Sequence, residues 1–356
     1  MGDGTGHIAS RGPSAVNDNT FRPFPGLSNP HLQTLAARAR RARFSARTRR
    51  VRLETNDDDF LDVDVFEIPT APRAVCLLLH GLEGCAASGY IVGAAAALGT
   101  RGILPVGLNF RSCGGEPNRT LGSYHSGRTD DISRTLEWIE GRYPGLPRAA
   151  VGFSLGGNAL LVHLGRQGNG ARRDAGIYAA ATVSVPYDLA RCADALEHGL
   201  GRLYTRYFLG SLKAKLREKA RRFPGEVSPL ALEAKTMRAF DDTFTAPAHG
   251  FSGAQDYYDR CSAARFVESV EVPTLLIQSI DDPLVPGDCL PLEAIGANPA
   301  LELLRTHRGG HVGFFARSDG AGPGGLLEST FSDFIAARVT RGDTAARDSQ
   351  NMTGSV

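Results

Sequence analysis

The pentapeptide Gly152-Phe153-Ser154-Leu155-Gly156 constrains the fold of this chain more than any other segment. Residues 148–151 before it have strand character, and residues 157–164 after it have the composition of a helix. A serine at a tight turn between a strand and a helix is typical of a nucleophile elbow, whose strained turn exposes the hydroxyl to a substrate. Glycine fits at 152 and 156 because a Cβ atom there would crowd the neighbouring strand and helix. We therefore predict an elbow rather than an ordinary glycine turn.

Strands and helices alternate along most of the chain. Strands are predicted at 51–54, 60–68, 73–80, 103–109, 148–151, 176–185, 273–280 and 301–306, with helices at 88–98, 130–143, 157–164 and 325–339. This alternation implies parallel pairing and a doubly wound α/β sheet. In such sheets, functional sites gather at the carboxyl ends of the strands. Five polar residues fall at such ends, and we expect them to share one site: His80, Asn109, Ser154, Asp281 and Asp282.

Residues 187–264 interrupt the alternation and are mainly helical. We predict that they form a lid inserted into an α/β core made of residues 21–186 and 265–341. The lid contains one apolar cluster: Tyr204, Tyr207, Phe208 and Leu209. That cluster either lines a substrate pocket or forms the lid's own small core, and the sequence favours neither. Residues 1–20 and 342–356 are polar, and we expect them to be disordered ends.

Composition and charge argue against several other classes of protein. The chain has 356 residues, of which 42% are hydrophobic and 22% charged, as in ordinary globular proteins. The net charge of +2 gives no indication of a nucleic-acid partner. Arginines crowd between positions 38 and 52, where a basic patch for RNA or lipid headgroups is one interpretation and a solvated surface segment is the one we favour.

The cysteines and the hydropathy pattern bear on where the protein works. The six cysteines are scattered, without a C-x-x-C pair or a zinc-binding spacing, which favours a reducing, cytoplasmic compartment. We see no signal peptide and no apolar run of the roughly 20 residues that a membrane helix needs. We therefore expect no integral membrane segment.

Nucleophilic catalysis by a serine requires two further side chains. A base must take the hydroxyl proton, and this base is usually a histidine that a carboxylate orients. In this type of fold, the chain order is serine, acid, histidine. We predict His311 as the base, because it follows the last strand and its flanking glycines would let the loop approach the elbow. His307 is the nearest rival but lies closer to the strand.

Two adjacent aspartates compete for the role of the acid. The strand at 273–280 ends at Asp281-Asp282-Pro283. Neighbouring residues at a strand end point in different directions, so we expect one carboxylate to face His311. We prefer Asp282, because Pro283 restricts its backbone. We expect Asp281 to bond the loop instead.

A tetrahedral intermediate would also need donors for its oxyanion. The elbow supplies the backbone N–H of Leu155, and we expect the second donor to be the N–H of Leu82, in the loop after the strand at 73–80. His80, at the end of that strand, is predicted to shape the loop rather than to catalyse. The aspartates at 57–59 are predicted to form a polar turn rather than a cation site.

Several segments together resemble the YheT-like branch of the α/β-hydrolase superfamily. They are Asn29-Pro30-His31-Leu32-Gln33-Thr34, Leu79-His80-Gly81-Leu82-Glu83-Gly84, Asn109-Phe110-Arg111-Ser112-Cys113-Gly114-Gly115, the elbow through Asn158, Phe240-Asp241-Asp242, Tyr257-Tyr258, Asp281-Asp282-Pro283 and Gly310-His311-Val312-Gly313. They span residues 21–340, nearly the whole chain. The first segment and 240–242 are more specific than the elbow, which the whole superfamily shares.

The resemblance implies an α/β-hydrolase fold and a carboxylic ester hydrolase with the triad Ser154, Asp282 and His311. It implies that the substrates are esters of short or medium acyl chains, or lipids, and that no cofactor or metal takes part. Eukaryotic relatives often carry an N-terminal membrane helix, which is not seen here. An acyltransferase or thioesterase could use the same residues, and a non-catalytic binding protein on this scaffold is a third hypothesis. The oligomeric state is not predicted.

Overall fold

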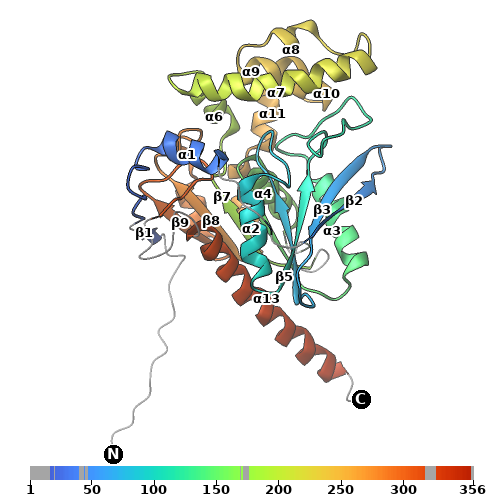
Figure 1. The fold of residues 1–356 in the computed structure, drawn as a ribbon, viewed down its shortest axis with the longest axis vertical. Helices are drawn as coiled ribbons and strands as arrows, with labels where there is room; N and C mark the ends of the chain where they lie inside the picture. Colours follow the sequence, from blue (N-terminus) through green and yellow to red (C-terminus); the bar gives the residue numbers. More distant parts are fainter. Residues whose placement is uncertain are drawn as a thin grey trace, which may run out of the picture.

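One large, mostly parallel sheet forms the centre of the protein (Figure 1). The structure, a computed structural model, describes residues 17–19, 21–39, 44, 47–168, 170, 176–316 and 326–353. Within them, nine strands form a sheet in the order β1-β9-β8-β7-β6-β4-β5-β3-β2. The strands are β1 (Asn17–Asn19), β2 (Thr48–Glu54), β3 (Phe60–Phe66), β4 (Ala74–Leu79), β5 (Ile103–Asn109), β6 (Arg148–Phe153), β7 (Ile177–Val183), β8 (Thr274–Ser279) and β9 (Leu301–Thr306). All neighbours are parallel except the pairs β2–β3 and β3–β5, which confirms the predicted mostly parallel sheet.

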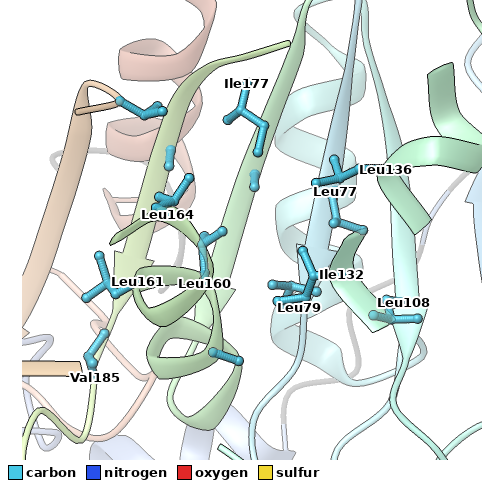
Figure 2. Packing of buried hydrophobic residues seen from close by; sticks show 14 of the residues in the cluster. Leu77, Leu79, Leu108, Ile132, Leu136, Leu160, Leu161, Leu164, Ile177 and Val185 are labelled. Atoms are coloured by element: carbon cyan, nitrogen blue, oxygen red, sulfur yellow. The ribbon is translucent and has the colours of Figure 1, made fainter. Parts of the chain in front are cut away.

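Helices cover both faces of this sheet, because its central strands are apolar on both sides. In β4, Val75, Leu77 and Leu79 belong to one apolar cluster, while Cys76 and Leu78 belong to another. This follows from the two-residue period of a strand. The first cluster includes side chains of α3 (Asp130–Arg142), α4 (Leu155–Gln167) and α12 (Leu292–Ala297), and the second those of α2 (Gly89–Gly99) and α13 (Leu326–Thr353). Figure 2 shows part of the first cluster, with leucines of β4 near those of α3 and α4. The sheet is therefore doubly wound, as predicted.

Six α-helices are inserted between β7 and β8, and we call them the lid. They are α6 (Leu189–Ala195), α7 (Gly201–Arg222), α8 (Pro229–Glu233), α9 (Met237–Phe240), α10 (Ala246–Ala248) and α11 (Ala254–Cys261). The long helix α7 lies with α8, α9 and α10 beyond one end of the sheet (Figure 1). The lid has an apolar cluster of its own, which also includes Leu284 and Val285 from the loop after β8. The lid is therefore packed onto the core through that loop.

We expected both ends of the chain to be disordered, but the parts of them that the structure describes form a strand and a helix. Most of the segment 1–20 lies outside the described residues, but Asn17–Asn19 pairs with β9 as β1. At the other end, α13 continues to Thr353, beyond position 339 where we predicted its end. Residues 340–353 contain no proline and a single glycine, so the backbone can continue as a helix.

Three further observations concern the cysteines, the helices and the arginine-rich segment. All six cysteines lie in the described residues as free thiols. Among the helices that the structure describes, none is long and apolar enough to cross a bilayer. In the arginine-rich segment, Arg50 and Arg52 of β2 pair with Asp64 and Asp62 of β3, while residues 40–43 lie outside the described part.

The polar turn at 57–59 has a structural partner that the sequence did not indicate. The Arg111 guanidinium, which is 3% exposed, lies 2.8 Å from Asp57 and 2.9 Å from both Asp59 and Asp131. Burial alone would raise the pKa of Asp57, but hydrogen bonds from Arg111 and Thr55 lower it to about 2. These carboxylates therefore neutralise a buried cation and connect the loop after β5 to α3 and to the β2–β3 turn.

We expect Arg111→Met to lower the free energy of unfolding by about 3–5 kcal/mol, because it removes the buried cation that pairs with both Asp59 and Asp131 and leaves Asp131 with the longer, 3.3 Å ion pair to Arg128. Urea denaturation followed by circular dichroism measures this loss. The matched control is Arg191→Met, since Arg191 pairs with Asp288 at the surface, where the two side chains are 47% and 70% exposed. That change should cost less than about 1 kcal/mol. Similar losses in both variants would contradict the prediction.

Candidate active site

Ser154 stands on a strained turn between β6 and α4. Its φ of 53° and ψ of −122° lie in a region that side-chain-bearing residues rarely adopt. A Cβ atom on Gly152 would lie 2.5 Å from the Gly156 carbonyl oxygen, and one on Gly156 would lie 2.5 Å from the carbonyl oxygens of Leu79 and His80. Only glycine fits either position. The predicted strand, turn and helix are present, and the turn has the geometry of a nucleophile elbow.

Ser154, His311 and Asp282 form one hydrogen-bonded chain, although 157 and 29 residues separate the successive partners. The Nε2 atom of His311 lies 2.7 Å from the Ser154 Oγ, and its Nδ1 lies 3.0 Å from the Asp282 Oδ2. A carboxylate can only accept, so Nδ1–H donates to Asp282 and the Nε2 lone pair faces the serine hydroxyl. This is the tautomer that a general base needs.

The carboxylate of Asp282 is held firmly in this orientation. Its side chain is fully buried, and its Oδ1 accepts hydrogen bonds from the backbone N–H groups of Leu284, at 2.9 Å, and Val285, at 3.2 Å. The neighbouring Asp281 turns away and accepts a hydrogen bond from the Ser279 hydroxyl. Burial raises the pKa of Asp281. Only one of the two adjacent carboxylates therefore faces His311.

The loop that carries His311 is seated on helix α1 (Pro30–Ala39). We predicted that its glycines would allow a close approach to the elbow, but the close contacts of these glycines are with other parts of the molecule. A Cβ atom on Gly310 would lie 2.6 Å from the Gln33 Cβ and 2.8 Å from the Thr34 nitrogen, so the close approach is to α1. The backbone N–H of His311 donates to the Thr34 Oγ1 at 2.8 Å.

Gln33 and Thr34 were not assigned a role from the sequence, although they belong to a segment that carries the family resemblance. Gln33 is fully buried, and its amide donates to the Phe315 carbonyl and accepts from the Phe315 N–H. Their place in that segment was the signal available, but the sequence does not show that Gln33 contacts Phe315, 282 residues away. These two side chains therefore hold the loop at His311 itself and at Phe315.

The loop after β4 passes close to the serine. A Cβ atom on Gly81 would lie 3.1 Å from the Ser154 Cβ. The N–H of Gly81 donates to the Tyr90 hydroxyl at 2.9 Å, that of Glu83 to the Tyr124 hydroxyl at 2.8 Å, and that of Gly84 to the Gly81 carbonyl at 3.0 Å. Among these four consecutive residues, the N–H of Leu82 has no acceptor within the described part of the chain.

The second predicted donor, the N–H of Leu155, stands at the first position of α4. The first N–H groups of a helix have no intrahelical acceptor and can bind an anion. Both predicted donors therefore come from segments that meet at Ser154, since Gly81 packs on the serine and Leu155 follows it directly.

His80 occupies a structural position in the same loop. It is fully buried, its Nε2 accepts from the Phe110 N–H at 3.1 Å, and its Nδ1 donates to the Gly81 carbonyl at 2.7 Å. Burial lowers the pKa of His80 to about 4, so the ring is neutral near pH 7. Because both ring nitrogens are occupied, His80 shapes the loop. Asn109 also bonds backbone and carboxylate groups of the core rather than the serine.

A mostly apolar cavity of about 710 Å³ adjoins Ser154 and His311. Helix α1 and lid helix α7 form much of its wall. The Tyr204 hydroxyl of α7 lies 3.0 Å from the His31 Nδ1 of α1, and the Arg38 guanidinium of α1 lies 3.8 Å from the centre of the Tyr207 ring. A cavity of this size and character is typical of small-molecule sites.

This cavity answers the question that the sequence left open about the lid's aromatic cluster. Tyr204, Tyr207 and Phe208 line the cavity, whereas Leu209 is 5% exposed and belongs to the lid's own apolar cluster. Both interpretations therefore hold: Leu209 belongs to the lid's core, while Tyr204 and Phe208 line the cavity and also pack against that core. The division follows from the helical period, because consecutive residues of α7 point to different sides.

The doubly wound sheet, the elbow and the serine–histidine–carboxylate chain define an α/β hydrolase. A family profile described as "Serine aminopeptidase, S33" matches residues 70–289. The putative esterase YheT of Escherichia coli K12 is 40% identical over 302 residues, which cover 83% of this chain and 86% of that protein. Phospholipase ABHD3 of Mus musculus is 30% identical over 301 residues, or 82% and 72% of the two chains.

The chain therefore belongs to the YheT-like branch of the α/β hydrolases, and it is a hydrolase of the esterase and lipase type. Among solved structures, the Pyrococcus furiosus esterase Pf2001 aligns with a TM-score of 0.53 and covers 84% of this chain and 92% of its own. At 17% sequence identity, this similarity concerns the fold alone.

We expect Asp282→Asn to lower kcat for a p-nitrophenyl ester by roughly 10³- to 10⁴-fold, because an amide stabilises the wrong histidine tautomer. Asp281→Asn makes the same chemical change one residue away, where the side chain bonds Ser279. It should cost less than about tenfold. Steady-state kinetics on the two purified variants compare them directly. A larger loss in Asp281→Asn would reassign the acid.

Proposed function

We propose that this protein is a serine carboxylic ester hydrolase that works through an acyl-enzyme, with Ser154 as nucleophile, His311 as general base and acid, and Asp282 as the orienting carboxylate. The observation that carries the proposal is the hydrogen-bonded chain of these three side chains beside an apolar cavity. Three relatives also support the proposal, since their names are putative esterase, phospholipase and monoacylglycerol lipase.

The reaction has two halves. In the first, the Ser154 Oγ attacks the ester carbonyl while His311 Nε2 takes the hydroxyl proton, and the imidazolium then gives that proton to the departing alkoxide. In the second, His311 takes a proton from water, which attacks the acyl carbonyl, and the imidazolium returns that proton to the Ser154 Oγ as the bond to the acyl group breaks and the acid leaves. Asp282 stabilises the imidazolium in both halves. The N–H groups of Leu82 and Leu155 would bind the oxyanion, where one donor is typically worth ~10²–10³ in kcat.

The substrate class we propose is esters of short- or medium-chain acids, or lipid esters. The apolar walls of the cavity suit an acyl chain, since burial of each methylene contributes about 0.8 kcal/mol. The aromatic side chains of Tyr204, Tyr207 and Phe208 would contact that chain from the lid side. An acyltransferase or thioesterase would form the same acyl-enzyme, and product analysis with competing alcohols and with thioesters distinguishes these activities.

A fluorophosphonate probe should label the wild-type protein at Ser154, because the probe phosphonylates a serine that an adjacent base activates. Ser154→Ala should abolish the labelling. Ser269→Ala serves as the matched control, since Ser269 is an exposed serine outside the site, and it should be labelled as the wild type is. Mass spectrometry of the modified peptide identifies the position. An unlabelled wild type, or labelling that survives in Ser154→Ala, would refute the proposal.

Phe208→Ala should raise KM for p-nitrophenyl octanoate by roughly tenfold while it changes KM for the acetate little, because only the longer chain gains from contact with the ring. A panel of esters of rising chain length measures the effect. Phe251→Ala is the control, since Phe251 is a half-buried lid phenylalanine that packs on Tyr257 rather than lining the cavity. Equal effects on acetate and octanoate would place the acyl chain elsewhere.

A further inference from the structure

Glu83 is a buried acid that the proposed reaction does not use. It follows Leu82 in the loop after β4, its side chain is fully buried, and its φ of 55° lies in the left-handed region that favours glycine. A side chain in this conformation persists only where its surroundings hold it. The surroundings of Glu83 therefore decide the shape of the loop that presents the Leu82 N–H.

Three side chains surround the Glu83 carboxylate, and two of them belong to the lid. Oε1 accepts from the Tyr124 hydroxyl at 2.7 Å and from the Lys215 Nζ at 2.8 Å, while Oε2 accepts from the Ser211 hydroxyl. Ser211 and Lys215 lie four residues apart on α7, so they share one face of that helix. Tyr124 also accepts the backbone N–H of Glu83, which closes a ring of hydrogen bonds around the residue.

The charge of this acid makes the lid contacts important. A carboxylate removed from water is costly unless a cation and hydrogen bonds compensate it, and Lys215 supplies the only cation bonded to Glu83 among the described residues. Burial alone would lower the pKa of Lys215, but the nearby Cys113 and Glu83 raise it, so the amine stays charged. If α7 moved away, Glu83 would lose its cation and the Ser211 hydroxyl together.

The same helix also reaches the substrate cavity. The first two turns of α7 carry Tyr204, Tyr207 and Phe208 into the cavity wall, and Ser211 and Lys215 follow one and two turns later. One rigid helix therefore contacts both the space for the substrate and the residue next to the proposed oxyanion donor.

We propose that Glu83 is a positioning residue, through which lid helix α7 holds the Leu82 N–H in place for the oxyanion. This inference rests on the proposed function, because it assumes that Leu82 is a donor. The lid then contributes to the catalytic site, because the oxyanion site is complete only while Ser211 and Lys215 are bonded to Glu83.

The test uses three single variants, Glu83→Gln, Lys215→Met and Ser211→Ala, and the double variant Glu83→Gln/Lys215→Met. We expect kcat to fall by roughly 10- to 100-fold in the two charge variants and less in Ser211→Ala, with KM nearly unchanged, because a misplaced donor weakens transition-state binding. In the double variant, the loss should be smaller than the product of the single losses, since both remove one shared interaction. Ser211→Ala removes no charge and keeps the test usable if a charge variant does not fold.

A second readout separates positioning from general stability. An alkyl trifluoromethyl ketone forms a tetrahedral adduct whose oxyanion needs the same donors, so its affinity should fall in parallel with kcat across the series. The control is Lys213→Met, two residues from Lys215 on the same helix, where the amine bonds the Ala234 carbonyl within the lid. This variant should keep both kcat and ketone affinity.

The possible outcomes decide between the two proposals. If the wild type is labelled by fluorophosphonate while the Glu83 and Lys215 variants keep wild-type kcat and ketone affinity, the coupling is refuted and the hydrolase proposal stands. If these variants lose only thermal stability, or if Lys213→Met loses as much activity as Lys215→Met, the role of Glu83 is structural and the inference also fails. An unlabelled wild type refutes the proposed function itself.

Discussion

The close backbone contact between the elbow and the end of β4 is the constraint on which the site depends. Gly156, at the start of α4, lies against the carbonyl groups of Leu79 and His80, where any larger residue would collide. That contact fixes the height of Ser154 above the sheet. It also fixes the start of the loop that continues into Gly81 and Leu82. One packing contact therefore positions both Ser154 and the start of the loop that passes close to it.

The other two members of the hydrogen-bonded chain are placed by different parts of the molecule. Asp282 follows β8, and two backbone N–H groups hold it; His311 follows β9, and α1 holds its loop. Strands β6, β8 and β9 run parallel, so their carboxyl ends lie at the same edge of the sheet. The Val312 N–H adds a bond to the Ser184 hydroxyl after β7. The strand order therefore brings Ser154, Asp282 and His311 to the same edge of the sheet, while contacts of the loops set the distances between them.

This division explains what could be predicted from the sequence. The sheet and the elbow follow from local patterns, because strand period and turn glycines act over a few residues, and the chain order of serine, acid and histidine follows from the type of fold. The seat of the His311 loop on Gln33 and the burial of Arg111 between three aspartates could not be predicted, since their partners are distant in the chain. To know which residues of the lid's aromatic cluster line the cavity also required the orientation of α7, which periodicity alone does not give.

The lid, inserted between β7 and β8, contacts the site through two different loops. Leu284 and Val285, whose N–H groups hold Asp282, are also members of the lid's apolar cluster. On the other side, α7 contacts the loop of Leu82 through Glu83. A lid packed only on its own core could move without effect on the charged groups below. Here the loop of Asp282 and the loop of Leu82 each share buried contacts with the lid, so a displacement of α7 would change the surroundings of at least one of them.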